Sequence, residues 1–303
     1  MPLVQYSDAV QKVSKDTPVE EILYLLKRDG GVFVKTLVSE EDVDQAYQEA
    51  KPRLDADTEW NAQTQRAPSL IARSPTYTKT QVMNPLFRQV CDHVLTSRRW
   101  YWWGGEKKLS LSKPYVHSCT AMRIGPGGKA QPLHRDDYIS HRDHAEIDHW
   151  DDARDMKRES AVGLFVAGCR ITKENGGTQF IPRSHLWGSD RATPPKVEQC
   201  IFADMDKGDG FLMLASADHG GGSNTTTDEH RLLFATFIVR GYLRQEENQF
   251  LAGPTDIARS YDREIQEYMG YSMREPACGY VEQVDPIYHL RPELKEENRP
   301  RDF

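Results

Sequence analysis

The sequence lacks the features that define several large classes of protein. No run of about 18 apolar residues is present, so we expect no membrane span. The N-terminus has no basic stretch followed by an apolar one, which argues against secretion. A formal net charge of −7 argues against nucleic-acid binding, which requires a basic face. The five cysteines are scattered, with no Cys-x-x-Cys pair, which disfavours disulfides and zinc–thiolate sites. These absences predict a soluble cytoplasmic protein.

Helical and strand-like patterns occupy different parts of the 303 residues. Apolar spacing predicts a helix over residues 17–29 and a strand over 32–38, and Ser39 is a predicted helix N-cap. Residues 51–80 contain few apolar side chains and predict a long loop that could bind a substrate. A further helix is predicted over 255–270. Short strand-like runs separated by Gly, Pro, Asn and Asp lie at 116–124, 161–169, 178–181, 210–214 and 232–239.

This order of elements predicts a mainly β protein with flanking helices, built on a double-stranded β-helix core of the jelly-roll, cupin-like type. No repeat or linker divides the sequence, so we interpret residues 1–303 as one domain. Within it we expect helical support over about residues 1–110, the jelly-roll core over about 115–245, and a C-terminal helix and tail over about 250–303.

A metal site is indicated by His134 and Asp136, which are two residues apart. On a strand, side chains at this spacing point to the same face. A second imidazole from His219, which follows an apolar run and precedes three glycines, would complete a set of two histidines and one carboxylate. Such a set holds non-haem Fe(II) and leaves coordination positions open for a cosubstrate and dioxygen. Asp137 would face the other way on the strand, and it is the weaker candidate ligand.

Arg231 lies twelve residues after His219 and opens an apolar strand. An arginine at a strand start is often an exposed charge. Its planar guanidinium is also suited to bidentate binding of a carboxylate, such as that of a 2-oxo acid. Together, the histidines, the carboxylate and this arginine predict an iron oxygenase that uses a 2-oxo acid.

Other chemically capable residues have simpler interpretations. Isolated histidines are usually structural, and we assign that role to His93, His117, His185 and His289. The polar tract at residues 140–149, with three more histidines, predicts a solvated loop near the site. The aromatic cluster at 100–103 (Trp-Tyr-Trp-Trp) could stack on a flat substrate, but core packing behind the sheet is favoured.

Three segments, in this order, resemble the phytanoyl-CoA dioxygenase family of Fe(II)/2-oxoglutarate oxygenases, and within it the fungal natural-product branch. They are Gln-Pro-Leu-His-Arg-Asp-Asp at 131–137, Glu-Asn-Gly-Gly-Thr-Gln-Phe-Ile-Pro-Arg-Ser-His-Leu-Trp at 174–187, and His-Gly-Gly-Gly-Ser-Asn-Thr-Thr-Thr at 219–227, followed by Arg231. The resemblance implies that His134, Asp136 and His219 bind and activate iron, and that Arg231 holds 2-oxoglutarate. It also implies that Gln131 and Thr178 line the cosubstrate pocket.

The implied reaction consumes 2-oxoglutarate and dioxygen and releases succinate and CO2 while a small substrate is hydroxylated, desaturated or rearranged. The resemblance suggests a fungal polyketide, alkaloid or meroterpenoid as substrate, with an acyl-CoA as the alternative, and a possible homodimer. Asp136 disfavours halogenation, since halogenases of this class have a small residue there. Candidate substrate contacts are Arg66, Tyr77 and Tyr138. A metal-assisted hydrolase and a non-catalytic small-molecule-binding barrel are the rival interpretations, and oxygen-dependent succinate formation would separate all three.

Overall fold

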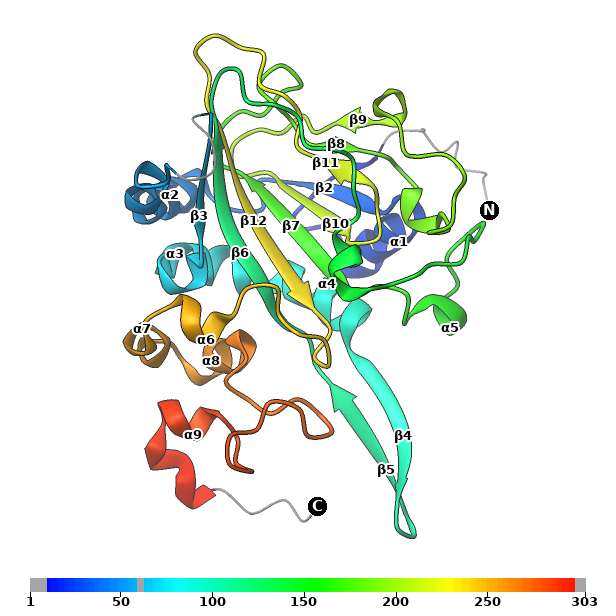
Figure 1. Ribbon diagram of the computed structural model, residues 1–303, viewed down its shortest axis with the longest axis vertical. Coiled ribbons are helices and arrows are strands. Elements are labelled where there is room, and N and C mark those ends of the chain that lie inside the picture. Colours follow the sequence, from blue (N-terminus) through cyan, green and yellow to red (C-terminus); the bar gives the residue numbers. More distant parts are fainter. Residues whose placement is uncertain (1–9, 59–62, 298–303) are drawn as a thin grey trace.

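The computed structural model describes residues 10–58 and 63–297. Its main feature is a seven-stranded sheet in the order β1-β2-β10-β7-β12-β6-β3 (Figure 1). All neighbouring strands pair antiparallel except β1 and β2, which are parallel. The strands are β1 (Lys12–Ser14), β2 (Gly31–Lys35), β3 (Thr64–Pro68), β6 (Tyr115–Ile124), β7 (Ala161–Ala167), β10 (Gly210–Leu214) and β12 (Arg231–Val239).

A smaller sheet, in the order β11-β8-β9, faces the large one. It consists of β8 (Gln179–Phe180), β9 (Ile201–Phe202) and β11 (His219–Gly220), and a bridge joins His134 to His219 at its edge. The space between the sheets is filled by buried apolar side chains, with Phe211 stacked on Phe33 and edge-on to Phe180. Two facing sheets around one core confirm the predicted jelly-roll architecture.

Helices cover the outer face of the large sheet and bury its other side chains. In the first helix, α1 (Val19–Asp29), Ile22, Leu23, Leu25 and Leu26 are buried. Gly30 ends this helix in the left-handed conformation (φ 82°), which glycine adopts without strain. Ser39 caps α2 (Glu40–Asp55) as predicted, because its hydroxyl accepts a hydrogen bond from the Asp42 N–H. Other helices on this side include η1 (Leu70–Ala72), α3 (Pro75–Tyr77), the π-helix η2 (Thr78–Val82) and α4 (Pro85–Leu95).

The predicted loop over residues 51–80 is wrong. The described part of this segment instead contains the end of α2, the edge strand β3 and three short helices. β3 pairs with β6 at the edge of the sheet. An edge strand has one side open to solvent, so it tolerates polar residues and its apolar pattern is weak. Tyr77, predicted to contact substrate, is fully buried in the core, and its hydroxyl bonds to the Ala235 carbonyl and to Thr236.

The predicted helix over 255–270 is divided into α7 (Thr255–Ser260) and α8 (Arg263–Met269). The buried Gln266 explains the break, since its amide donates to the carbonyls of Ala258 and Tyr261 at the end of α7. These bonds replace the helical hydrogen bonds that the interruption removes. The other short helices are η3 (Asp136–Ser140), α5 (Asp152–Asp155), η4 (Ser184–Leu186), η5 (Val197–Gln199), α6 (Gln249–Ala252), α9 (Ile287–Leu290) and η6 (Pro292–Glu297).

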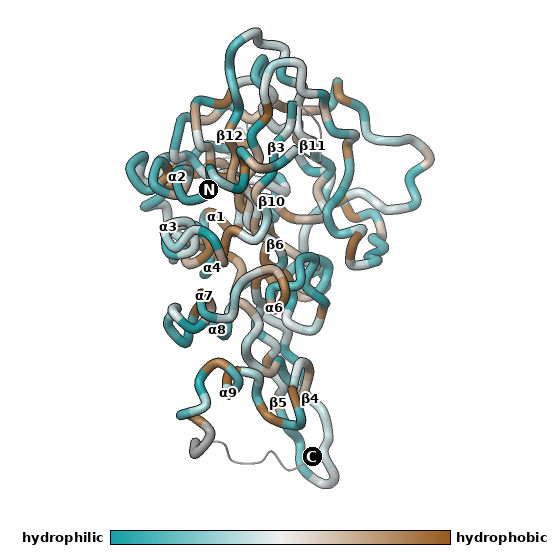
Figure 2. The backbone as a smooth tube through the Cα atoms, turned by 60° about the vertical axis from the view of Figure 1, so that its left-hand side comes forward, coloured by the Kyte–Doolittle hydropathy of each residue, from teal (hydrophilic) through white to brown (hydrophobic). Residues whose placement is uncertain are grey.

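A two-stranded hairpin, β4 (Ser97–Trp103) and β5 (Glu106–Ser112), projects from one end of the molecule (Figures 1 and 2). The aromatic cluster predicted to pack in the core lies on it, and Trp100, Trp102 and Trp103 are 60%, 67% and 49% exposed. That prediction is therefore wrong. No helix within the described residues is long and apolar enough to cross a membrane.

Candidate iron and 2-oxoglutarate site

His134, Asp136 and His219 come together at the mouth of the barrel. Their potential ligand atoms all lie within 4.8 Å of one another, and within residues 10–58 and 63–297 they are the only such group. The Asp136 carboxylate lies between the imidazoles, 3.5 Å from His134 Nε2 and 3.4 Å from His219 Nε2. These three residues are the ones predicted from the sequence to bind metal.

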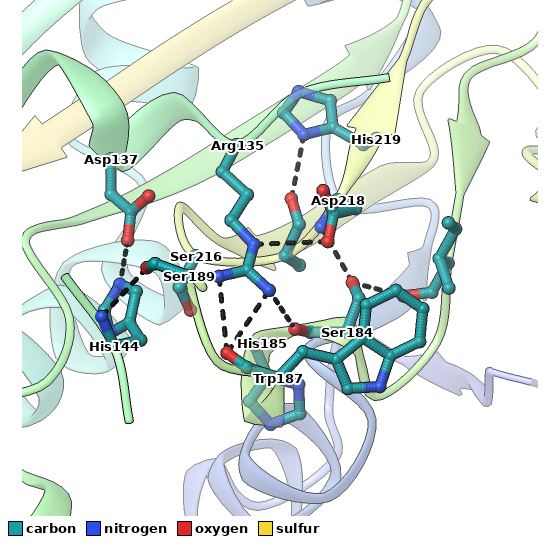
Figure 3. A network of polar contacts seen from close by, with 12 residues as sticks. Arg135, Asp137, His144, Ser184, His185, Trp187, Ser189, Ser216, Asp218 and His219 are labelled. Carbon is teal, nitrogen blue, oxygen red and sulfur yellow. Dashed lines mark hydrogen bonds and ion pairs between the residues drawn. The ribbon is translucent and has the colours of Figure 1, made fainter. Parts of the chain in front are cut away.

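The backbone places the two histidines opposite each other. His134 and His219 exchange both N–H···O=C bonds, each at 2.9 Å. The reason given for Asp136 was only partly correct, since it does not continue a strand but begins the short helix η3. The turn into this helix brings the carboxylate toward the histidines, and it buries Asp137 elsewhere, against His144 (Figure 3).

Hydrogen bonds fix the orientation of both imidazoles. His134 Nδ1 lies 2.8 Å from the Pro132 carbonyl, and His219 Nδ1 lies 3.2 Å from the Ala217 carbonyl. A carbonyl only accepts, so each Nδ1 carries the hydrogen and each Nε2 presents a lone pair to the centre. This arrangement orients histidines in many protein metal sites.

The charges in the cluster suit a divalent cation. Burial raises the pKa of Asp136, but the two imidazoles offset this and hold it below its usual value. Burial lowers the pKa of His219, whereas the hydrogen bond to Asp136 raises that of His134. One Asp136 oxygen, Oδ2, is buried without a hydrogen-bond partner among the described residues. An ionised carboxylate with a free buried oxygen fits a metal ligand.

Arg135 and Asp218 join the two metal-binding segments (Figure 3). Arg135 Nε donates to Asp218 Oδ2 at 3.1 Å, and its NH2 group donates to the Ser184 carbonyl at 2.9 Å. The Asp218 N–H donates to the Ser184 hydroxyl at 2.7 Å. Each of these charged residues is next to a predicted ligand in sequence. The network explains the conspicuous motif at 174–187, because its turn anchors both segments.

Arg231 opens β12 and is only 2% exposed. Its guanidinium lines a cavity beside His134 and Gln131, and burial lowers its pKa to about 10. Its Nε and Nη1 atoms are buried without hydrogen-bond partners in the described part of the chain. A buried guanidinium in this state is suited to an anionic ligand, and the alternative of an exposed edge charge is wrong.

The glycines after His219 allow the chain to pass close to its neighbours before it returns to Arg231. A Cβ at Gly222 would lie 2.5 Å from the Gly177 carbonyl oxygen, so no side chain fits there. Asn224 holds the returning loop by donating to the carbonyls of Ile124 and Glu229. This loop accounts for the twelve-residue spacing between His219 and Arg231.

A cavity of about 250 Å³ is lined by His134, Asp136 and His219 and is the natural place for a substrate. Arg66 and Tyr138, the predicted substrate contacts, line it, and so does Gln131, which was predicted to line the cosubstrate pocket. Thr178 lines neither this cavity nor the one at Arg231. It is buried beside β8, where its carbonyl accepts a bond from the Ala203 N–H, and its role stays a prediction.

His117 was assigned a structural role, yet its side chain lines the same cavity. The pairing of β6 with β12 shifts between Phe237 and Ile238, which leaves His117 unpaired opposite them. Such a bulge re-aims side chains, and His117 and Ser118 both line the cavity. A bulge has no clear sequence signature here, so this residue could not be identified from spacing.

Comparison with known proteins identifies the family. Residues 26–232 match the family described as phytanoyl-CoA dioxygenase. The chain is 34% identical over 280 residues to dioxygenase himG of Aspergillus japonicus, covering 88% of this chain and 86% of the relative. It is also 34% identical over 277 residues to dioxygenase peniF of Penicillium patulum, covering 90% and 89%.

A solved structure with a similar fold is the epimerase SnoN in complex with Fe3+, alpha ketoglutarate and nogalamycin RO. The TM-score is 0.54 and the identity 16%, over 88% of this chain and 93% of that one. The chain belongs to the phytanoyl-CoA dioxygenase family, and is thus a non-haem iron, 2-oxoglutarate-dependent dioxygenase acting on small metabolites. The hydrolase and the non-catalytic barrel are set aside.

Proposed function

We propose that this enzyme couples the conversion of 2-oxoglutarate to succinate and CO2 to oxidation of a C–H bond in an oxygen-bearing secondary metabolite. His134, Asp136 and His219 would hold Fe(II), which together with dioxygen supplies the oxidising power when bound. The observation that carries the proposal is the buried, unsatisfied guanidinium of Arg231 in a cavity that also reaches His134. The relatives himG and peniF are fungal dioxygenases, which favours a fungal metabolite over an acyl-CoA.

Arg231 and Gln131 would bind the two ends of 2-oxoglutarate. Arg231 would pair with the carboxylate far from the metal through its guanidinium, two of whose nitrogens lack partners among the described residues. Gln131 Oε1 accepts the Gly221 N–H at 2.9 Å, which leaves its amide nitrogen as a donor. Gln131 lines both cavities, so this donor would lie between the cosubstrate and the substrate.

The substrate cavity combines an apolar wall with a few polar groups. Phe165, Ala235 and Phe237 form part of the wall, and Arg66 and Glu246 lie among the polar groups and attract each other. A cavity with both charges does not require a charged substrate. An apolar molecule of limited size with a few oxygen atoms fits this lining.

His117 would recognise one of those oxygen atoms. Its Nδ1 accepts the Glu246 N–H at 2.9 Å, so the hydrogen of the neutral imidazole is on Nε2. Burial lowers the pKa of His117, which favours that neutral form. The ring is therefore held as a hydrogen-bond donor for a carbonyl, ether or hydroxyl oxygen of the substrate. We infer that this bond selects which C–H is oxidised, whether the outcome is hydroxylation, desaturation or rearrangement.

An anaerobic titration tests the iron and 2-oxoglutarate assignment. Fe(II) with 2-oxoglutarate should give a charge-transfer band at about 500 nm, the range typical of this ligand set. His219→Ala should abolish the band, and the matched control His149→Ala should retain it. When oxygen is added, the wild-type enzyme should convert the bound 2-oxoglutarate to succinate. A well-folded wild type with neither band nor succinate would refute the proposal.

We further propose that the enzyme acts in the cytoplasm as a homodimer. All five cysteines are free, as expected of a reducing compartment. Thiol titration of protein from the native host, with and without reductant, should give five thiols in both cases. Fewer without reductant would place it in an oxidising compartment.

A further inference from the structure

The β4–β5 hairpin exposes to solvent a face with four large apolar residues, which Arg98 and Lys107 flank on the same side. Alternation along the paired strands places Trp100 and Trp102 of β4 on the same side as Leu109 and Leu111 of β5. We call these four residues the open face. Their side chains are between 38% and 67% exposed, although all belong to types that are usually buried. On the other side, Ser110 is buried and Tyr101 half-buried, so the body of the protein covers part of that face.

This hairpin lacks the contacts that normally stabilise two strands. Among the described elements, β4 and β5 pack mainly on each other, and they form a separate sheet with no third strand. A two-stranded ribbon with one face uncovered has little to stabilise it in water. A contiguous exposed apolar face on a projecting arm indicates a surface that another molecule covers.

Charge indicates the partner. Ser97–Ser112 carries four basic residues and one acidic residue, a formal charge of +3, whereas the whole chain carries −7. The rest of the chain thus has a formal charge of −10. A basic arm on an acidic body is complementary to a second copy of the same chain. Two hairpins pairing directly would bring like charges together.

A matching surface lies at the same end of the molecule. The C-terminal segment, defined here as residues 275–294, has four acidic residues and one basic residue. It exposes Tyr280 (51%) and Val281 (40%), and in both ribbon and tube views it lies beside the hairpin end (Figures 1 and 2). A two-fold interface requires one patch that carries both halves of a complementary pair. This end of the molecule has that property.

We propose that the chain forms a two-fold dimer in which the open face of each hairpin covers the C-terminal segment of the other copy. The two indoles and two leucines of one hairpin supply about 400 Å² of surface. They would cover a similar area of the partner, and the two-fold axis repeats the contact. The whole interface would then bury about 1,600 Å², the usual size of a specific complex. The inference rests on the homodimer part of the proposed function and not on its iron chemistry.

Sedimentation velocity of the full chain at micromolar concentrations tests the dimer. The wild type should sediment as a dimer, and Trp100→Ser with Trp102→Ser should sediment as a monomer. Trp103→Ser, on the opposite face of the same strand, should remain dimeric. Tyr280→Ser with Val281→Ser should also give a monomer. A monomeric wild type, or a dimer unaffected by the open-face variant, would overturn the proposal.

Mixing the two monomeric variants gives a sharper test. A two-fold exchange predicts partial recovery of the dimer, because the mixed pair retains one of its two contacts. Arg98→Glu with Lys107→Glu keeps the indoles but reverses the charge, and it should weaken association at low salt. Binding of a monomeric wild type to phosphatidylserine vesicles would instead assign the open face to membranes and reject the dimer. Measuring the iron band on every variant separates failure of the dimer from failure of the proposed function.

Discussion

The barrel mouth buries polar side chains, whereas the hairpin exposes apolar ones. At the barrel mouth, charged and polar residues are buried and joined by hydrogen bonds, from Arg135 and Asp218 to the Ser184 turn. On the hairpin, tryptophans that could fill a core are exposed. A buried polar group requires a partner, so the unsatisfied atoms of Arg231 and Asp136 indicate ligands. An exposed apolar group indicates a missing surface. Both regions are incomplete, one toward small ions and the other toward a protein.

The largest effect is expected from the metal-binding carboxylate. Asp136→Ala should lower oxygen-dependent succinate formation on the order of 1,000-fold, because one corner of the iron site is lost. Asp137→Asn is the control, since Asp137 is buried against His144 and not among the ligands. It should lower the melting temperature but retain one iron per chain, measured by metal analysis. Loss of iron in Asp137→Asn alone would reverse the assignment.

Replacement of Arg231 should weaken cosubstrate binding but increase the stability of the ligand-free fold. Arg231→Met should weaken 2-oxoglutarate binding about 100-fold, since a buried charge partner is removed. The same change should stabilise the ligand-free fold by about 1–3 kcal/mol, because a desolvated charge is replaced by an apolar side chain. Calorimetric titration and urea unfolding measure the two effects. Unchanged affinity would show that the cosubstrate carboxylate binds elsewhere.

The residues that position the ligands should have a smaller effect. Arg135→Met should reduce iron affinity about 10- to 100-fold, the range found for residues that orient metal ligands. Arg170→Met is a matched control, because Arg170 is half exposed and pairs with Asp204 on the surface. Competition with a chelator measures the affinities. Equal effects of the two variants would contradict a positioning role for Arg135.

Acid should destabilise the fold through His185, which is fully buried and donates from Nε2 to the Lys27 carbonyl. Burial lowers the pKa of His185 from 6.5 to about 3. Between these values the unfolded state binds more protons, so stability falls as the pH falls. The cost is about 2 kcal/mol from pH 6.5 to about pH 5. His185→Gln should flatten the pH dependence of urea unfolding, whereas His289→Gln should not.

The smallest effect on folding is expected on the hairpin. Trp102→Ser should change the stability of the isolated subunit by no more than about 0.5 kcal/mol, since the side chain is 67% exposed. Urea unfolding of dilute protein measures the stability of the isolated subunit, and the iron band shows separately whether the metal site is intact. A loss of several kcal/mol would show that the indole packs within its own subunit.

Most of the iron site could be predicted from the sequence, because its residues are defined by chemistry and order. His219 precedes three glycines and Arg231 opens an apolar run, which fix where their strands lie, whereas His134 and Asp136 are identified by their two-residue spacing. The strand assumed for Asp136 was incorrect, yet the residue was right, since a turn after His134 also directs its carboxylate to the histidines.

The remainder depended on long-range packing. His117 enters the cavity only because of a bulge against β12, and Tyr77 is in the core because α3 packs beneath the sheet. The strand β3 has few apolar residues and is stabilised by pairing with β6. The exposure of Trp100 and Trp102 could not be inferred either. Aromatic residues have the same pattern in sequence whether they face their own core or another chain.

The buried guanidinium of Arg231 has a consequence for the lifetime of the protein in the cell. A desolvated charge without a counter-ion weakens the fold, and a dianion that binds it restores stability that grows with the logarithm of the dianion's concentration above its Kd. Fewer molecules unfold when 2-oxoglutarate is abundant, so fewer are exposed to proteolysis. The size of the cosubstrate pool would set how much enzyme persists as well as how fast it turns over.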